Sequence, residues 1–189
     1  GGLNFAGVYQ TPCVLICQNN HWAISVPTAK QSASKTLAIK ARAYGIPGVR
    51  VDGNDVLAVY RAVFDAAERA RAGGGPTFIE SVTYRMGAHS SSDDPSRYRD
   101  QAEVDAWAKK DPIVRFEKYL RRTGVLNDSI KESLELELET EFNEAIKAIE
   151  ELAPPERASL FEDVYASLPA QLKEQQEALL AGAKAPKEH

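Results

Sequence analysis

The first hundred residues alternate short apolar runs with longer segments of helical periodicity. Thr11–Gln18 is a continuous apolar run that ends at Asn19-Asn20, a pattern typical of a strand buried on both faces. Further strands are predicted over 49–51 and 78–84, and between them apolar residues of 56–67 recur on one helical face. Strand, helix and strand at this spacing predict a parallel α/β unit.

Capping residues set the expected ends of the helices in this half. Asn54 is expected to cap the helix that follows the second strand, and the run Gly73-Gly74-Gly75-Pro76 is expected to end it. A further helix is predicted over Thr36–Tyr44, ended by Gly45.

The second half is predicted to be helical. Asp100 and Glu103 form a capping box for a helix through Lys110, and Asp111-Pro112 begins a helix that closes before Gly124. A long amphipathic helix follows, because apolar residues recur every three or four positions at Ile130, Leu134, Leu138, Phe142, Ile146 and Ile149.

The last segment contains two more helix-start signals. Ser159 with Glu162 is a second capping box, and Pro169 is placed to begin a helix that reaches about Leu180. The tail Ala181–His189 is expected to fray. The fold class is therefore α/β, with a parallel sheet and flanking helices over residues 1–99 and an α-helical carboxyl-terminal region over 100–189.

Charge separates the same two regions. Residues 1–99 hold 11 Lys and Arg against 7 Asp and Glu, whereas residues 100–189 hold 12 against 20. The positive excess of the first region suits a phosphate-bearing ligand, but no basic cluster of the kind that binds nucleic acid is present. No apolar stretch approaches the ~20 residues that span a bilayer.

Cysteine use favours a reducing compartment. Cys13 and Cys17 lie four residues apart in a predicted strand, roughly 13 Å at 3.3 Å per residue, which is too far for a disulfide. Two unbridged thiols are typical of an intracellular protein.

Two loops follow predicted strands where open α/β sheets bind ligands. In the first, Gln18–Trp22, an Asn carbonyl oxygen can ligate Mg²⁺, but Asn-Asn after a strand is also an ordinary turn.

The second loop, Arg85–Asp94, leaves alternatives open. His89 is either an acid, base or phosphate donor, or a solvated side chain. Asp93-Asp94 is either a metal site or a local hydrogen-bonding pair. Ser90, Ser91 and Ser92 can accept phosphate or stay unmodified.

Several separated motifs, in order along the whole chain, resemble one family. They are Gly2–Ala6, Cys17–Ser25, Val51–Asp55, Tyr84–Asp94 with Tyr98-Arg99, Leu160–Tyr165 and Leu168–Leu172. Together they resemble the alpha subunit of the thiamin-diphosphate-dependent 2-oxoacid dehydrogenases, most closely the branched-chain enzyme and next the pyruvate enzyme.

The resemblance implies roles for individual residues. Asn20 supplies a side-chain oxygen and Trp22 a main-chain carbonyl to Mg²⁺. His89 lies beside the cofactor diphosphate and the reaction centre, and Gln18 and Arg85 belong to the cofactor-binding set. Gln18 stands where relatives often have Arg. The resemblance also implies a regulatory loop, in which Ser90 matches a serine that is phosphorylated in relatives. Asp93, Tyr98 and Arg99 match residues of this ordered phosphorylation loop.

The resemblance also implies an assembly. In this family thiamin diphosphate lies between alpha and beta subunits of a heterotetramer, and the acyl group passes to a lipoyl arm of an acyltransferase component. The chain begins at Gly1 without Met, so we expect the opening half of the thiamin motif, with its acidic Mg²⁺ ligand, to precede it. The function that the resemblance implies is a share in the oxidative decarboxylation of a branched-chain 2-oxoacid by such a complex. The alternative is that the isolated chain is an inactive assembly or interaction module. A Cys or Ser hydrolase is disfavoured, because no Gly-x-Ser-x-Gly elbow is present.

Overall fold

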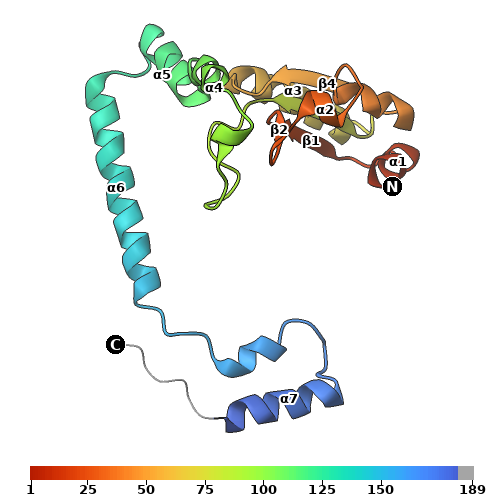
Figure 1. Cartoon of the computed structure of the whole chain (residues 1–189), viewed down its shortest axis with the longest axis vertical. Coiled ribbons are helices and arrows are strands. Elements are labelled where there is room, and N and C mark those ends of the chain that lie inside the picture. Colours follow the sequence, from red (N-terminus) through yellow and green to blue (C-terminus); the bar gives the residue numbers. More distant parts are fainter. Residues whose placement is uncertain (183–189) are drawn as a thin grey trace. The chain divides into compact units, whose positions relative to one another are not determined.

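The structure is a computed structural model that describes residues 1–182 and divides into two compact units. The first unit comprises Gly1–Asn127 and the second begins at Asp128. Figure 1 gives the elements of each.

A three-stranded parallel sheet lies at the centre of the first unit. Its strands are β1 (Val14–Asn19), β4 (Gly48–Asp52) and β5 (Thr77–Val82), in the order β1-β5-β4. Helix α3 (Val56–Arg71) joins β4 to β5 and packs on all three strands. The predicted parallel sheet with flanking helices is therefore confirmed, and its strands end together near Asn19, Val82 and Asp52.

Short elements surround this sheet. They are α1 (Gly2–Val8), the antiparallel pair β2 (Trp22–Ala23) and β3 (Val26–Pro27), α2 (Thr28–Gln31), the 3-10 helices η1 (Ala38–Tyr44) and η2 (Pro95–Arg97), α4 (Gln101–Ala108) and α5 (Pro112–Arg122). The second unit contains α6 (Asp128–Glu150), the 3-10 helix η3 (Arg157–Phe161) and α7 (Ala170–Ala181).

Local signals placed most helix ends correctly. Asp100 and Asp111 cap α4 and α5 through backbone N–H groups, and Gly45 ends η1 in the left-handed conformation. Pro169 directly precedes α7. Of the tail expected to fray, Ala181 ends α7, and residues 183–189 lie outside the described residues.

Asn54 does not cap α3, which corrects one prediction. The Asp55 carboxylate accepts from the N–H groups of Leu57 and Ala58, whereas the buried Asn54 side chain accepts a hydrogen bond from the Thr83 hydroxyl at 2.7 Å. The Asn54 side chain is hydrogen-bonded to Thr83, just after β5, so Asp55 caps the helix instead.

Two further segments with predicted helix signals contain 3-10 helices. The helix predicted over Thr36–Tyr44 is the 3-10 helix η1, and its first N–H, at Ala38, is bound by a buried side chain of β5. Ser159 does not begin a helix: it lies inside η3, and its hydroxyl donates to the carbonyl of Glu156, the residue before η3.

β1 is more exposed than its apolar sequence predicts. It pairs with β5 on one side only among the described residues, and 58% of the Ile16 surface is accessible. The expectation of a strand buried on both faces therefore does not hold here, because no described element covers that part of β1.

Helices α4 and α5 belong to the α/β unit, so the compact unit extends beyond residue 99. The Trp107 ring of α4 stacks on Tyr84, with centroids 5.3 Å apart and planes 9° apart. Arg115 of α5 pairs with Asp52 and Asp55 at 2.9 and 3.3 Å. Side-chain contacts across the end of the sheet, which follow no local pattern, thus join these helices to it.

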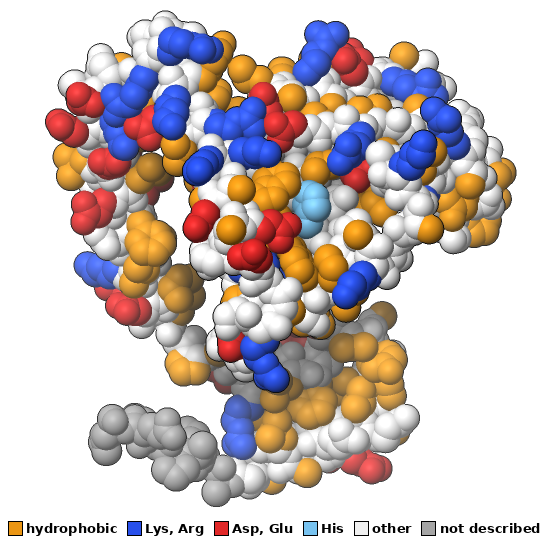
Figure 2. All heavy atoms as spheres, turned by 45° about the horizontal axis from the view of Figure 1, so that its top comes forward, with side chains coloured by type: hydrophobic (Ala, Val, Ile, Leu, Met, Phe, Trp, Pro, Cys, Tyr) orange, Lys and Arg blue, Asp and Glu red, His pale blue; other side chains and the backbone are white. Residues whose placement is uncertain are grey.

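The surface of the described chain carries charges of both signs. On the face in Figure 2, Lys and Arg side chains are interspersed with acidic and apolar ones. None of the described helices is long and apolar enough to cross a membrane.

Candidate functional site

A tight turn joins the end of β1 to β2. The Asn20 side-chain oxygen accepts from the Trp22 N–H at 3.1 Å, and His21 between them has a φ of 68°. This is the turn that an Asn-Asn pair favours. An amide oxygen has two lone pairs, so the turn leaves the Asn20 oxygen able to accept a second partner.

Three of the predicted site residues line one cavity beside this turn. Its volume is about 260 Å³. It is lined by Gln18, Asn19, Asn20, Trp22, Ala23, Thr28, Gln31, Ser32, Leu37 and Lys40. The cavity therefore lies at the carboxyl end of a parallel strand, where α/β sheets bind ligands. Lys40 was not singled out from sequence, because nothing near it in the chain marks it as part of a site.

Arg85 and Tyr98 pack against the turn. The Arg85 N–H donates to the carbonyl of Asn20 at 3.1 Å, and its guanidinium donates to the carbonyl of Ile24 at 2.6 Å and to Tyr98 at 3.3 Å. The Tyr98 ring lies 5.5 Å from the ring of Trp22. The Arg85 Nε is buried without a hydrogen-bond partner in the described part of the chain.

Asp93 organises the loop over 86–94. Its carboxylate accepts from the Tyr98 hydroxyl at 2.6 Å and from the His89 N–H at 2.8 Å. These two donors hold the pKa of Asp93 below its usual value. The same hydrogen bond raises the pKa of Tyr98, because ionising the phenol would place two negative charges together.

Arg99 fixes the start of the same loop. Its guanidinium donates to the carbonyls of Arg85, Met86 and Gly87, at 2.7 Å for Met86. It also lies over the Tyr84 ring, 5.7 Å from the centroid. The loop that carries His89 is thus anchored at both ends by side chains that follow it.

The His89 side chain does not line the cavity of Gln18, Asn20 and Trp22. It is exposed on the loop, and only its backbone N–H makes a described hydrogen bond. Ser90 is exposed beside it, with its hydroxyl 3.3 Å from that of Ser92. The structure therefore brings Gln18, Asn20, Trp22, Arg85 and Tyr98 together and leaves His89 outside the group.

Asp93 and Asp94 both make local hydrogen bonds. Asp94 accepts from the Ser96 N–H and hydroxyl at 3.1 and 2.6 Å. Within residues 1–182, no group of three or more His, Cys, Asp and Glu side chains could hold a metal ion. The local reading of this acidic pair is the one that the geometry supports.

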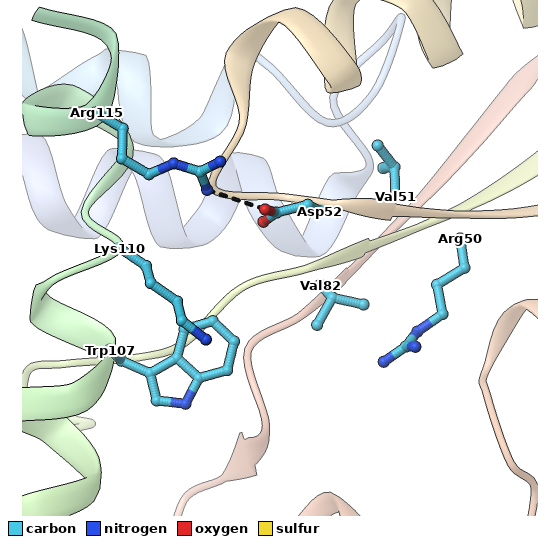
Figure 3. A pocket seen from close by; sticks show the side chains of 7 residues that line it. All are labelled: Arg50, Val51, Asp52, Val82, Trp107, Lys110 and Arg115. Carbon is cyan, nitrogen blue, oxygen red and sulfur yellow. Dashed lines mark hydrogen bonds and ion pairs between the residues drawn. The ribbon is translucent and has the colours of Figure 1, made fainter. Parts of the chain in front are cut away.

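A larger cavity, of about 520 Å³, lies at the end of β4 (Figure 3). It is lined by Arg50, Val51, Asp52, Val82, Trp107, Lys110 and Arg115. Partial burial alone would raise the pKa of Asp52, but the Arg115 guanidinium and the Asn54 N–H outweigh it and lower the pKa. Arg115 is committed to Asp52 and Asp55, so little of its charge is left for a ligand.

The donor set of the smaller cavity fits part of a magnesium site. Mg²⁺ prefers oxygen ligands in an octahedron, and Asn20 offers an amide oxygen within the same turn as the carbonyl of Trp22. Pro27, which faces Trp22 in the β2 and β3 pair, has no N–H to donate to that carbonyl. Asn20 and Trp22 are thus candidates for two hard oxygen ligands, and the remaining ligands of an octahedron must come from elsewhere.

The parallel sheet with a polar cavity at the carboxyl end of β1 is an α/β unit with a candidate ligand site at a strand end. The chain belongs to the Dehydrogenase E1 component family, which it matches over residues 1–157.

Curated relatives are similar over almost the whole chain. The 3-methyl-2-oxobutanoate dehydrogenase subunit alpha of Mycobacterium tuberculosis (strain CDC 1551 / Oshkosh) is 48% identical over 179 residues, which are 95% of this chain and 49% of the relative. The pyruvate dehydrogenase E1 component subunit alpha of Acholeplasma laidlawii is 50% identical over 178 residues, 93% of this chain and 52% of the relative. The pyruvate dehydrogenase E1 component subunit alpha of Staphylococcus epidermidis (strain ATCC 12228 / FDA PCI 1200) is 46% identical over 177 residues, which are 93% of this chain and 48% of the relative. The chain thus spans about half the length of these relatives.

Proposed function

We propose that this chain is part of the decarboxylating component of a 2-oxoacid dehydrogenase complex. The reaction is oxidative decarboxylation of a 2-oxoacid, a branched-chain one in our proposal, with transfer of the acyl group to lipoyl groups. The observation that carries the proposal is that Gln18, Asn20 and Trp22 line one cavity at the end of β1 in a chain of this family.

Each residue of the cavity has a proposed binding role. The Asn20 amide oxygen and the Trp22 carbonyl hold Mg²⁺, and the Gln18 amide hydrogen-bonds the diphosphate of thiamin diphosphate. Arg85 supports the turn through the carbonyls of Asn20 and Ile24, and its charge favours an anionic group nearby. When bound, thiamin diphosphate supplies the electron sink for decarboxylation.

The loop over 86–94 has a second proposed role. His89 holds or moves a proton at the reaction centre, and its backbone position is fixed by Asp93. Ser90 is the proposed phosphate acceptor of a regulatory loop ordered by Asp93, Tyr98 and Arg99. The exposure of Ser90 and the contacts of the other three support this assignment.

The proposed assembly contains two alpha and two beta subunits and a lipoyl-bearing acyltransferase component. The relatives are named as alpha subunits, two of them of an E1 component, which supports this arrangement. We propose a bacterial cytoplasmic location, or the mitochondrial matrix if the source is eukaryotic.

A binding experiment tests the cavity. Isothermal titration of thiamin diphosphate with Mg²⁺ into this chain, completed with the remaining length of its subunit and with beta, should give a stoichiometric signal. Asn20→Ala should abolish the Mg²⁺-dependent part, whereas Asn143→Ala, an exposed asparagine of α6, should leave it unchanged. Absence of binding in the complete wild-type assembly would contradict the proposal.

The alternative is that the 189 residues act alone as an inactive interaction module. A decarboxylation assay separates the two, and we expect no turnover by the isolated chain and measurable turnover by the complete assembly. The substrate follows from comparing kcat/KM for 3-methyl-2-oxobutanoate and pyruvate in that assembly. A higher value for pyruvate would overturn the branched-chain assignment.

A further inference from the structure

Glu80 is a carboxylate buried in the middle of the sheet. It lies on the central strand β5, directly after Ile79 of the core, and only 1% of its surface is accessible. Burying a charge in an apolar layer is costly unless the charge is paired and hydrogen-bonded. A Glu at this position therefore needs an explanation beyond packing.

Three segments of the first unit meet at this carboxylate. Its Oε1 accepts from the Asn19 side-chain amide at 2.9 Å, and its Oε2 accepts from the N–H of Ala38, at the start of η1, at 2.9 Å. The Nε of Arg50 on β4 lies 3.8 Å away. Glu80 thus connects both neighbouring strands and η1.

The contact with Asn19 fixes which way its amide group faces. Because the nitrogen donates to Glu80, the oxygen faces the turn, where it accepts from the His21 N–H at 3.2 Å and the Thr28 hydroxyl at 3.3 Å. A carboxylate only accepts, so it enforces this orientation, which an amide in its place would not.

The two residues that carry the oxygens proposed for Mg²⁺ lie on either side of His21. Asn20 follows Asn19 directly, and its own oxygen accepts from the Trp22 N–H. Residues that orient metal ligands without contacting the metal commonly contribute about 10- to 100-fold to metal affinity, which is lost when they are removed.

We infer that Glu80 is a positioning residue, which sets the turn of Asn20 and Trp22 for Mg²⁺ by holding the Asn19 amide. The inference rests on the proposed function, because it concerns the same cation site. Glu80 itself does not contact the cation and acts through Asn19.

An exchange of polarity provides the test. Glu80→Gln places an amide nitrogen opposite a donor, either at Asn19 or at Ala38. In the double variant Asn19→Asp with Glu80→Gln, the amide introduced on β5 donates to the carboxylate introduced on β1 and still accepts from Ala38. That carboxylate retains an oxygen for His21 and Thr28, so every hydrogen bond has a counterpart.

The measurement is the Kd for Mg²⁺ in the complete alpha and beta assembly at saturating thiamin diphosphate. We expect Glu80→Gln to raise this Kd about tenfold, with kcat at saturating Mg²⁺ nearly unchanged. The double variant should return the Kd to within about threefold of wild type.

A second readout needs no cofactor. Hydrogen exchange at the His21 N–H should accelerate in Glu80→Gln and slow again in the double variant. Ile79→Val is the matched control, because it shortens a core side chain next to Glu80 in the strand. The side chains of Ile79 and Glu80 point to opposite faces of the sheet. The control variant should lower Tm without changing either readout.

The outcomes separate the two proposals. If the wild-type assembly binds no Mg²⁺ with thiamin diphosphate, the proposed function fails. Two results would overturn the positioning role and make Glu80 a structural residue. One is a wild-type Kd for Mg²⁺ in Glu80→Gln. The other is a double variant that regains the wild-type Tm but not the wild-type Kd.

Discussion

The hydroxyl of Tyr98 donates a 2.6 Å hydrogen bond to the carboxylate of Asp93, and this contact closes the loop that carries His89. Tyr98→Phe removes this bond together with the one from the Arg85 guanidinium, and keeps the ring against Trp22. We expect faster hydrogen exchange at the loop amides, above all at His89, with Tm nearly unchanged. Tyr119→Phe removes a hydroxyl in α5 and should leave the loop alone; equal exchange in both variants would contradict this view of the loop.

The same bond determines how the loop responds to acid. The pKa of Asp93 is held below its ordinary 3.8, so the ionised form and its two hydrogen bonds persist at every pH above that value. They are lost as the pH falls through the lowered pKa. Carboxyl carbon shifts recorded against pH should show an Asp93 midpoint below 3.8, and Tyr98→Phe should move that midpoint upward. A midpoint that does not move would mean that Tyr98 does not stabilise the charge.

The environment of Cys17 responds to the charges around it. Burial raises the pKa of its thiol, the Glu80 carboxylate raises it further, and Lys40 opposes them. In a Cys13→Ser background, Lys40→Met should slow iodoacetamide alkylation at about pH 8 and Glu80→Gln should speed it, because only the thiolate reacts. Opposite signs are the essential result; two changes in the same direction would reflect altered access rather than charge.

Local signals in the sequence predicted the strands and most caps, because these depend on neighbours along the chain. Gly45 ends η1 and Asp111 begins α5, as the sequence predicted. Asn54 and Asp55 are both good caps, and the choice between them follows from Thr83, 29 residues beyond Asn54 along the chain. No local pattern contains that contact.

The candidate site divides in the same way. Asn20 and Trp22 are recognisable because they lie within one short motif at the end of a strand. Glu80 has a visible signal, a charge within an apolar strand, but its partner Asn19 lies 61 residues away. Lys40 lines the cavity because of the path of η1, which the sequence predicted only as a helix over Thr36–Tyr44.

The stacking of Trp107 on Tyr84 is expected to hold α4 on the end of β5. Trp107→Ala should lower the free energy of unfolding by about 1–2 kcal/mol, since an aromatic pair contributes about 0.5–1.5 kcal/mol beyond its buried area. Trp107→Phe keeps a ring and should recover most of the loss. Urea unfolding followed by circular dichroism measures both, and equal losses in the two variants would show that the ring contact contributes little.

Asp55 combines a helix cap with an ion pair, and two substitutions separate them. Its carboxylate accepts from Leu57 and Ala58 at 3.1 Å each and pairs with Arg115 at 3.3 Å. Asn caps a helix as well as Asp does but carries no charge, so Asp55→Asn should remove only the ion pair. We expect it to lower the free energy of unfolding by less than about 1 kcal/mol at this exposed position. Asp55→Ala loses both and should cost about 1 kcal/mol more.

Arg115→Met completes the comparison from the other side of the ion pair. It removes the pairs with both Asp52 and Asp55 while the cap stays, so its cost should be that of Asp55→Asn plus the loss of the Asp52 pair. The pKa of Asp52 should rise as well, because Arg115 lowers it in the wild type. The loss from Arg115→Met should therefore shrink as the pH falls and Asp52 becomes protonated. A loss that is independent of pH would indicate that packing of the arginine stem, rather than its charge, holds α5 on the sheet.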